Sequence, residues 1–151
     1  MHVVAPQPRD PKLPIFFNVD TSVGDKGANS SAEDILLVQF LIRQIAEEVP
    51  SSQPGGESRR QRMLKVPMSG SCDGATIDGI RAWQEARKVS APGTVVDGLV
   101  SQARGYFYGP GEWTIVDLNA IFRQAFKEIW PRLDKRSSCP GLLRLRVIQV
   151  L

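Results

Sequence analysis

Residues 34–42 carry the stretch Asp34-Ile35-Leu36-Leu37-Val38-Gln39-Phe40-Leu41-Ile42, one of the longest apolar runs of the chain. Apolar residues at spacings of three and four continue to Ile45, which is the period of an amphipathic helix. Ser30 or Ser31 can cap its N-terminus, and Val49-Pro50 is typical of a helix end. We therefore predict a helix that runs to about Glu48.

Two further helices follow from the same period. Ile77, Ile80 and Trp83 share one face of a helix predicted from about residue 75 to 88. A third apolar stripe runs from residue 118 to 129, with Thr114 as the expected cap and Asp117 as its partner in a capping box. The three helices and the loop-rich connections between them predict an all-α fold, a compact three-helix domain.

The segments outside these helices are predicted to be extended or irregular. Four prolines in residues 1–14 indicate an extended arm, followed by a short apolar strand or staple at 15–17. Composition indicates inserted loops at 50–62 and 104–111. We thus expect an arm at 1–14, a domain at 15–130 and a basic C-terminal tail at 131–151. Apolar and polar residues alternate only in part over the last ten residues, so either a strand or a helix fits this segment.

The composition excludes several classes of protein. The chain has 151 residues, which suits one domain, and its apolar runs are too short to cross a bilayer. It has one histidine, His2, and two cysteines, Cys72 and Cys139, too few for a Cys/His zinc site or a histidine-based catalyst. The cysteines can form a disulfide or remain two thiols. No phosphate-binding glycine motif is present, and we expect neither a cofactor nor an enzyme.

The positive net charge of +3 belongs to the C-terminal part. Residues 1–122 hold 12 Lys or Arg against 14 Asp or Glu, a net charge of −2. Residues 123–151 hold 7 against 2, a net charge of +5. This end is either a solvated basic surface or an attraction for an anionic partner. Only Trp130 is interleaved with its basic residues, so nucleic acid is not the expected partner.

Three ordered motifs resemble one known family. Val23-Gly24 precedes a helix with Val38-Gln39-Phe40-Leu41, Thr76 begins a helix that carries Ile80-Arg81-Ala82-Trp83-Gln84, and Asp97-Gly98-Leu99-Val100 precedes Thr114 to Asn119. In this order they resemble the three-helix peptidoglycan-binding domain found beside cell-wall hydrolases. The similarity covers roughly residues 19–122. We expect the amides of Gln39 and Gln84 to tie loops to the helices.

The resemblance implies a ligand groove made of loops. Flat aromatic rings on a glycine-rich loop suit either sugar rings or a protein partner, as at Tyr106, Phe107 and Tyr108. The candidate ligand-binding residues, which would supply hydrogen bonds and ring stacking, are Ser69, Gly70, Asp73, Asp97, Tyr106, Tyr108 and Trp113.

The expected function is non-catalytic binding of peptidoglycan or a muropeptide, through its glycan or its stem peptide. The alternative is a structural or adaptor protein of a phage tail, a contractile injection system or a secretion system, which would use the fold to bind another protein. The longer loops at 50–62 and 106–110 and the proline-rich arm favour this alternative. The N-terminal residues lack a general secretory signal, so we expect a protein made in the cytoplasm that reaches the cell envelope, if at all, by another route.

Overall fold

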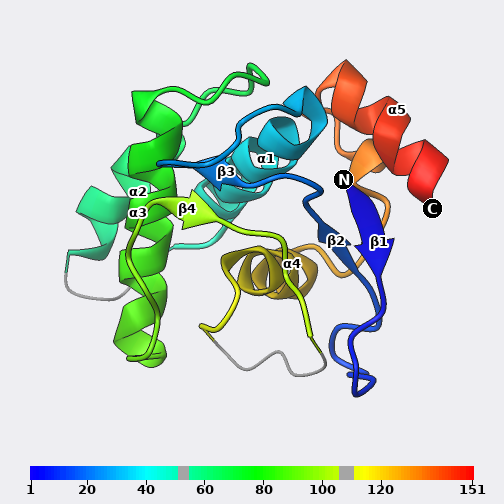
Figure 1. Cartoon of the computed structure of the whole chain (residues 1–151), viewed down its shortest axis with the longest axis horizontal. Helices are drawn as coiled ribbons and strands as arrows, with labels where there is room; N and C mark the ends of the chain where they lie inside the picture. The colour runs from blue at the N-terminus through cyan, green and yellow to red at the C-terminus, as the bar shows by residue number, and fades with distance from the viewer. Residues whose placement is uncertain (51–54, 106–110) are drawn as a thin grey trace.

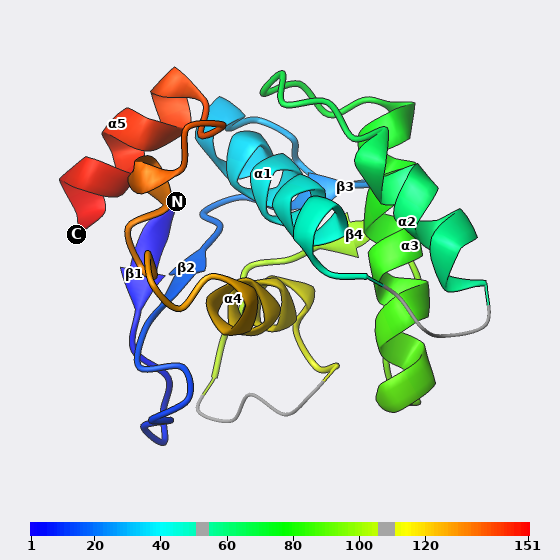
Figure 2. The same ribbon diagram turned by 180° about the vertical axis from the view of Figure 1, so that it is seen from behind.

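Helix α1 (Ala32–Glu48) lies at the centre of the fold in the computed structural model, which describes residues 1–50, 55–105 and 111–151. Helices α2 (Gly56–Leu64) and α3 (Gly74–Ser90) pack on one side of α1, and α5 (Gly141–Val150) lies on the other side (Figures 1 and 2). Helix α4 (Thr114–Ala125) packs against α1 and completes the core. The described residues thus contain five α-helices. A short 3-10 helix, η1 (Leu133–Lys135), lies between α4 and α5.

The first predicted helix is confirmed. Ser31 is its cap, and the Ser31 hydroxyl accepts a hydrogen bond from the Asp34 backbone N–H at 3.1 Å. Glu33 and Asp34 place negative charge in the first turn, where the helix dipole favours it. The helix is buried on nearly all sides, because α2, α3, α4 and α5 all contact it. Each fully buried leucine or phenylalanine side chain contributes about 1.5–3 kcal/mol through lost contact with water.

The other two predicted helices are also present, with one difference at each end of α4. The stripe was expected to run to residue 129, but the helix ends at Ala125 and turns follow it. Asp73 caps α3, as its side chain accepts a hydrogen bond from the Thr76 backbone N–H at 2.8 Å. The expected cap of α4, Thr114, is instead the first residue of the helix, and Trp113 holds the cap position without a side-chain hydrogen bond. The prediction of a capping box was wrong because the Thr114 hydroxyl instead accepts a hydrogen bond from the Gln84 side chain.

Two small antiparallel sheets accompany the helices. Strand β1 (His2–Val4) pairs with β2 (Phe16–Asn18), which confirms the strand expected near residues 15–17. Strand β3 (Val23–Gly24) pairs with β4 (Leu99–Val100) across the front of α3 (Figure 1). The side chain of Asn119 bonds both the N–H and the C=O of Phe17, at 2.8 and 2.9 Å. This pair joins the first sheet to α4.

The fold is therefore mostly helical, as predicted, but it is not a purely α-helical three-helix domain. Residues 56–62, predicted as part of an inserted loop, belong to α2. This helix buries only Gly56 and Met63, so it has no apolar stripe to reveal it. Arginines fix it instead: the Arg60 guanidinium donates to the Ala46 carbonyl at 2.6 Å.

Both ends of the chain belong to the core rather than to an arm and a tail. Met1 and Leu13 are buried at the N-terminal end, and Leu133, Leu143 and Val147 are buried at the C-terminal end. These apolar side chains outweigh the proline and arginine content from which we predicted separate segments. The basic segment is also held by polar contacts, because the buried Gln44 of α1 accepts hydrogen bonds from Arg136 and Ser138, both at 2.9 Å.

The second predicted insertion, 104–111, lies mostly outside the described residues, which omit 106–110. Across the described part of the chain, none of the helices combines the length and the apolar character needed to cross a membrane.

Candidate functional site

Gln39 ties the loop before α3 to the central helix. Its side-chain oxygen accepts hydrogen bonds from the backbone N–H groups of Ser69 and Gly70, at 3.1 and 3.0 Å. Its amide nitrogen donates to the Ser71 carbonyl and to the Thr76 hydroxyl, both at 2.9 Å. Gln39 is fully buried, so these partners satisfy an amide that would otherwise be costly to bury. The expected role of Gln39 is confirmed.

The predicted ligand residues at this loop are used by the fold itself. The carboxylate of Asp73 accepts hydrogen bonds from the Thr76 N–H at 2.8 Å and from the Thr76 hydroxyl at 2.7 Å. These bonds lower the pKa of Asp73. The Ser69 hydroxyl donates a hydrogen bond to the Ser71 carbonyl and accepts one from the Ser71 N–H, both at 3.2 Å. Ser69, Gly70 and Asp73 therefore shape the loop and the start of α3.

Gln84, ten residues after Gly74 on α3, ties a second turn to this helix, again as expected. Its side-chain oxygen accepts hydrogen bonds from the N–H groups of Asp97 and Gly98, at 3.1 and 2.8 Å. Its amide nitrogen donates to the Asp97 carboxylate at 3.0 Å, to the Leu99 carbonyl at 3.1 Å and to the Thr114 hydroxyl at 3.1 Å. One buried side chain thus holds the turn at 97–98 against the first residue of α4.

A polar pocket of about 170 Å³ opens beside Gln84. Asp97 and Trp113, both predicted as ligand residues, line it together. Asp97 is exposed, and Trp113 is half-buried. The wall combines carboxylates, hydroxyls and apolar surface, and the remaining lining residues are Gln84, Val95, Leu99, Ser101, Gly111, Glu112 and Thr114. We call this the Asp97–Trp113 pocket.

The indole N–H of Trp113 is the most unusual group of the pocket lining. It is buried and has no hydrogen-bond partner among the described residues. A buried N–H without an acceptor costs free energy, roughly 1–3 kcal/mol, which a bound acceptor would recover. The pocket therefore brings an aromatic residue and the Asp97 carboxylate into one small space, which suits a ligand with hydroxyl or amide groups.

Asp117 holds Gly111, one of the residues that line the pocket. Its carboxylate accepts a hydrogen bond from the Gly111 N–H at 2.9 Å and lies 3.4 Å from the Arg87 guanidinium. Burial raises the pKa of Asp117, although Arg87 opposes the shift. Gly111 has a φ of +78°, and a Cβ there would lie 2.4 Å from the Thr94 hydroxyl oxygen. Only glycine fits this close approach without strain.

The seven predicted residues do not form one groove. Asp97 and Trp113 share a pocket, whereas Ser69, Gly70 and Asp73 lie near the other end of α3. Gly74 and Gln84 are ten residues apart on α3, which corresponds to about 15 Å. The last two predicted residues, Tyr106 and Tyr108, lie outside the described residues. The sequence did not point to Ser101 or Glu112, because neither belongs to a motif.

The β3 turn occupies the space between the two groups. Its Asp25 N–H donates to the Gly98 carbonyl at 2.9 Å, and the Asp25 carboxylate pairs with Arg81 of α3 at 2.6 Å. Gly24 has a φ of +122°, and a Cβ there would lie 2.0 Å from the Gly98 oxygen. The glycine therefore allows the two strands to approach closely at this point.

The basic C-terminal segment makes extensive contacts within the molecule. Arg132 pairs with Asp134 at 2.7 Å, and Arg146 pairs with Glu33 of α1 at 3.2 Å. The Arg144 guanidinium donates to backbone carbonyls of the preceding loop, including that of Cys139 at 3.2 Å. These contacts give much of the basic charge a structural role.

The two cysteines are separate, unpaired thiols. Burial raises the pKa of Cys139 to about 11, and burial also raises that of Cys72. Neither thiol has the lowered pKa of a reactive cysteine. Among the residues that the structure describes, no group of three or more His, Cys, Asp or Glu side chains gathers in a way that would hold a metal ion.

Comparison with protein-family models, with curated proteins and with solved structures gives no significant match to this chain.

Proposed function

We propose that this chain is a non-catalytic binding module that recognises cell-wall glycan or stem peptide through the Asp97–Trp113 pocket. The observation that carries the proposal is that one pocket is lined by the exposed Asp97 and by Trp113, whose indole N–H has no partner among the described residues. Sugar rings present apolar faces to aromatic side chains and hydroxyl groups to carboxylates. Their N-acetyl carbonyl groups can accept from an N–H such as that of Trp113.

The resemblance to three-helix peptidoglycan-binding domains gives independent support. Two glutamines that belong to its motifs, Gln39 and Gln84, are buried, and each ties a loop to the helices. The backbone N–H groups of the motif residues Asp97 and Gly98 donate hydrogen bonds to the Gln84 side chain. The motifs thus describe one connected arrangement of helices and turns. A shared arrangement alone does not imply a shared ligand, so the proposal depends on the pocket.

A titration with soluble muropeptides and with glycan oligomers tests the proposal. We expect saturable shifts of the Trp113 indole N–H signal in ¹H–¹⁵N spectra, assigned through Trp113→Phe. Asp97→Asn keeps the side-chain oxygen that Gln84 and Leu99 use, and it removes the charge. We expect it to weaken binding at least about tenfold, the value of one charged hydrogen bond. No shift of the Trp113 signal at millimolar ligand would overturn the proposal.

One feature favours the second candidate function, an adaptor in a phage, contractile injection or secretion assembly. Helix α5 buries Leu143 and Val147. The helix and the residue after it expose other large apolar side chains, which are Leu142, Leu145, Ile148 and Leu151. A contiguous exposed apolar surface is typical of protein–protein contact sites. A defined complex on co-purification from the native host, lost in Leu145→Glu, would favour this candidate. A strict monomer without a protein partner would count against it.

A further inference from the structure

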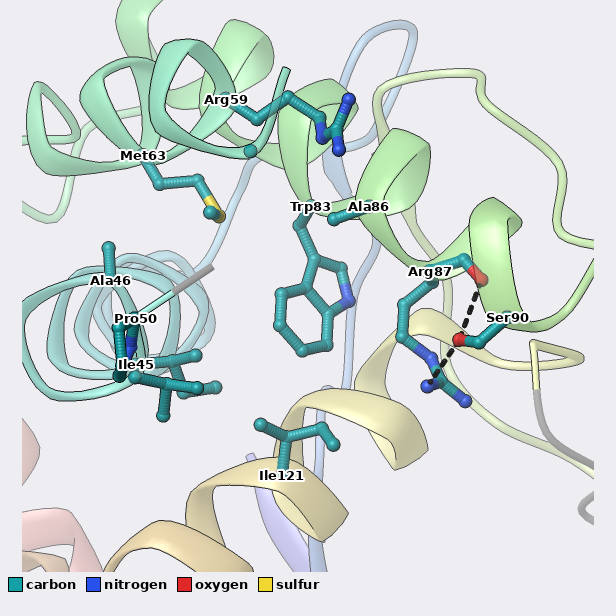
Figure 3. Close-up of a pocket in the computed structure, with 12 residues that line it drawn as sticks. Ile45, Ala46, Pro50, Arg59, Met63, Trp83, Ala86, Arg87, Ser90 and Ile121 are labelled. Atoms are coloured by element: carbon teal, nitrogen blue, oxygen red, sulfur yellow. Dashed lines mark hydrogen bonds between the residues drawn. The ribbon is translucent and has the colours of Figure 1, made fainter. Parts of the chain in front are cut away.

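A second, mainly apolar pocket of about 220 Å³ lies between α1, α2, α3 and α4, away from the Asp97–Trp113 pocket (Figure 3). The Trp83 ring stands in its centre, with Ile45 and Met63 on one side and Ile121 below. Arg87 lies on the other side of the ring, and the indole nitrogen is on the ring edge that faces Arg87. We call this the Trp83 pocket.

Two buried donors of this pocket are without an acceptor in the described part of the chain. They are the indole N–H of Trp83 and the Nε–H of Arg87. Trp83 is 5% exposed, so its N–H is not open to bulk water. The terminal nitrogens of Arg87 have only long hydrogen bonds, at 3.3 Å to the Ser90 hydroxyl and 3.4 Å to Asp117. Buried donors nearly always have a partner in native proteins, so this pair points to an acceptor from outside the chain.

The charge of the pocket defines that acceptor. The guanidinium groups of Arg59 and Arg87 line the pocket, and its described lining residues include no Asp or Glu. The Asp117 carboxylate, which is outside this lining, lies 3.4 Å from the Arg87 guanidinium. Arginine binds carboxylates better than neutral acceptors because the hydrogen bonds are charge-assisted. Apart from Ser90, the rest of the wall is apolar, so the group that carries the carboxylate must itself be apolar.

We propose that the Trp83 pocket binds a small carboxylic acid with an apolar body about the size of a leucine side chain. The carboxylate accepts hydrogen bonds from Trp83 Nε1 and Arg87 Nε, and the body lies between Ile45, Met63 and Ile121. This site shares no lining residue with the proposed glycan site. The same chemistry is present in a free aliphatic acid and at the C-terminus of a peptide that ends in an apolar residue.

The test uses the full chain and the indole N–H signals of its three tryptophans, assigned through single Trp→Phe variants. The probes are N-acetylleucine, its uncharged counterpart N-acetylleucinamide, octanoate and a short peptide that ends in leucine. For a ligand of this size we expect a Kd on the order of 1 mM. The Trp83 signal should shift saturably with N-acetylleucine and at least about tenfold more weakly with the amide. Tighter binding of octanoate or of the peptide identifies the source.

Matched variants locate the site. Arg87→Gln should weaken N-acetylleucine binding at least about tenfold, while Lys88→Gln, with the same loss of charge at an exposed neighbour, should leave it unchanged. If Arg87→Gln does not fold, Ala86→Leu, which fills the pocket, takes its place and should abolish binding. The proposal is overturned if the Trp83 signal does not move, if acid and amide act equally, or if the signal that moves is that of Trp113. A bound water alone would give the first of these results.

Discussion

Replacing Gln84 with leucine should be among the most destabilising substitutions in this protein that keep the side-chain volume nearly unchanged. Gln84 is 1% exposed, and its side chain makes five hydrogen bonds. Leucine fills a similar space but offers no donor or acceptor. The N–H groups of Asp97 and Gly98 would therefore lose their acceptor, and the Leu99 carbonyl and the Thr114 hydroxyl would lose a donor.

The expected loss follows from these groups. Each backbone N–H left buried without an acceptor costs about 1–3 kcal/mol, and the remaining lost bonds add a smaller amount. We expect the free energy of unfolding to fall by about 4 kcal/mol. For a domain of this size that corresponds to a fall in Tm of roughly 8–16 °C. Urea denaturation followed by circular dichroism and by tryptophan fluorescence measures the change, with the slope of the transition as a check on two-state behaviour.

Gln124→Leu is the matched control, because Gln124 is an exposed residue of α4. It should change the free energy of unfolding by no more than about 0.5 kcal/mol. A loss of less than about 1 kcal/mol in Gln84→Leu would refute the argument that this side chain holds the turn and α4 together.

Three further predictions concern stability and reactivity. Gly24→Ala should lower the free energy of unfolding by about 3 kcal/mol or prevent folding. The φ of +122° is strained for alanine, and the new Cβ would lie 2.0 Å from the Gly98 backbone oxygen. Thermal melts measure the loss. Arg62 lowers the pKa of Asp78, so their ion pair at 2.7 Å stabilises the fold above the unfolded-state pKa of about 3.9 and ceases to do so as the pH falls through the lower folded value. The small difference in Tm between the wild type and Asp78→Asn should thus vanish near pH 2, and a difference that persists there would contradict it. Iodoacetamide at pH 8 should label the partly exposed Cys72 well before the buried Cys139, whose pKa of about 11 keeps it protonated; equal rates by mass spectrometry would be the contrary result.

The helices that were predicted from the sequence are those that bury an apolar stripe. Helix α1 shows its period plainly because its leucines and isoleucines face the core. Helix α2 was missed because polar contacts hold it: Arg62 binds Asp78 and Glu85 of α3, both at 2.7 Å. Helix α5 could not be told from a strand, because exposed leucines such as Leu145 obscure the period of its buried residues.

The candidate site was predicted in part for a different reason. The motifs correctly indicated that Gln39 and Gln84 are structural, since an amide inside an apolar helix face must find partners. Asp97, from a motif, and Trp113, from the aromatic residues near the glycine-rich loop, line one pocket in the structure. Motif order carries no distance, however, so the position of Ser69, Gly70 and Asp73 near the other end of α3 was not foreseeable. The β3 pairing that separates the two groups spans only two residues per strand and left no pattern.

We propose that the Asp97–Trp113 pocket recognises the bacterial cell wall. Sedimentation with purified peptidoglycan sacculi at low salt tests it most directly, with the folded wild type, Trp113→Ala and, as control, Leu145→Ala on the exposed face of α5. We predict that the wild type and the control sediment with the sacculi and that Trp113→Ala remains in the supernatant. Failure of the folded wild type to sediment, or equal sedimentation of Trp113→Ala, would contradict the claim.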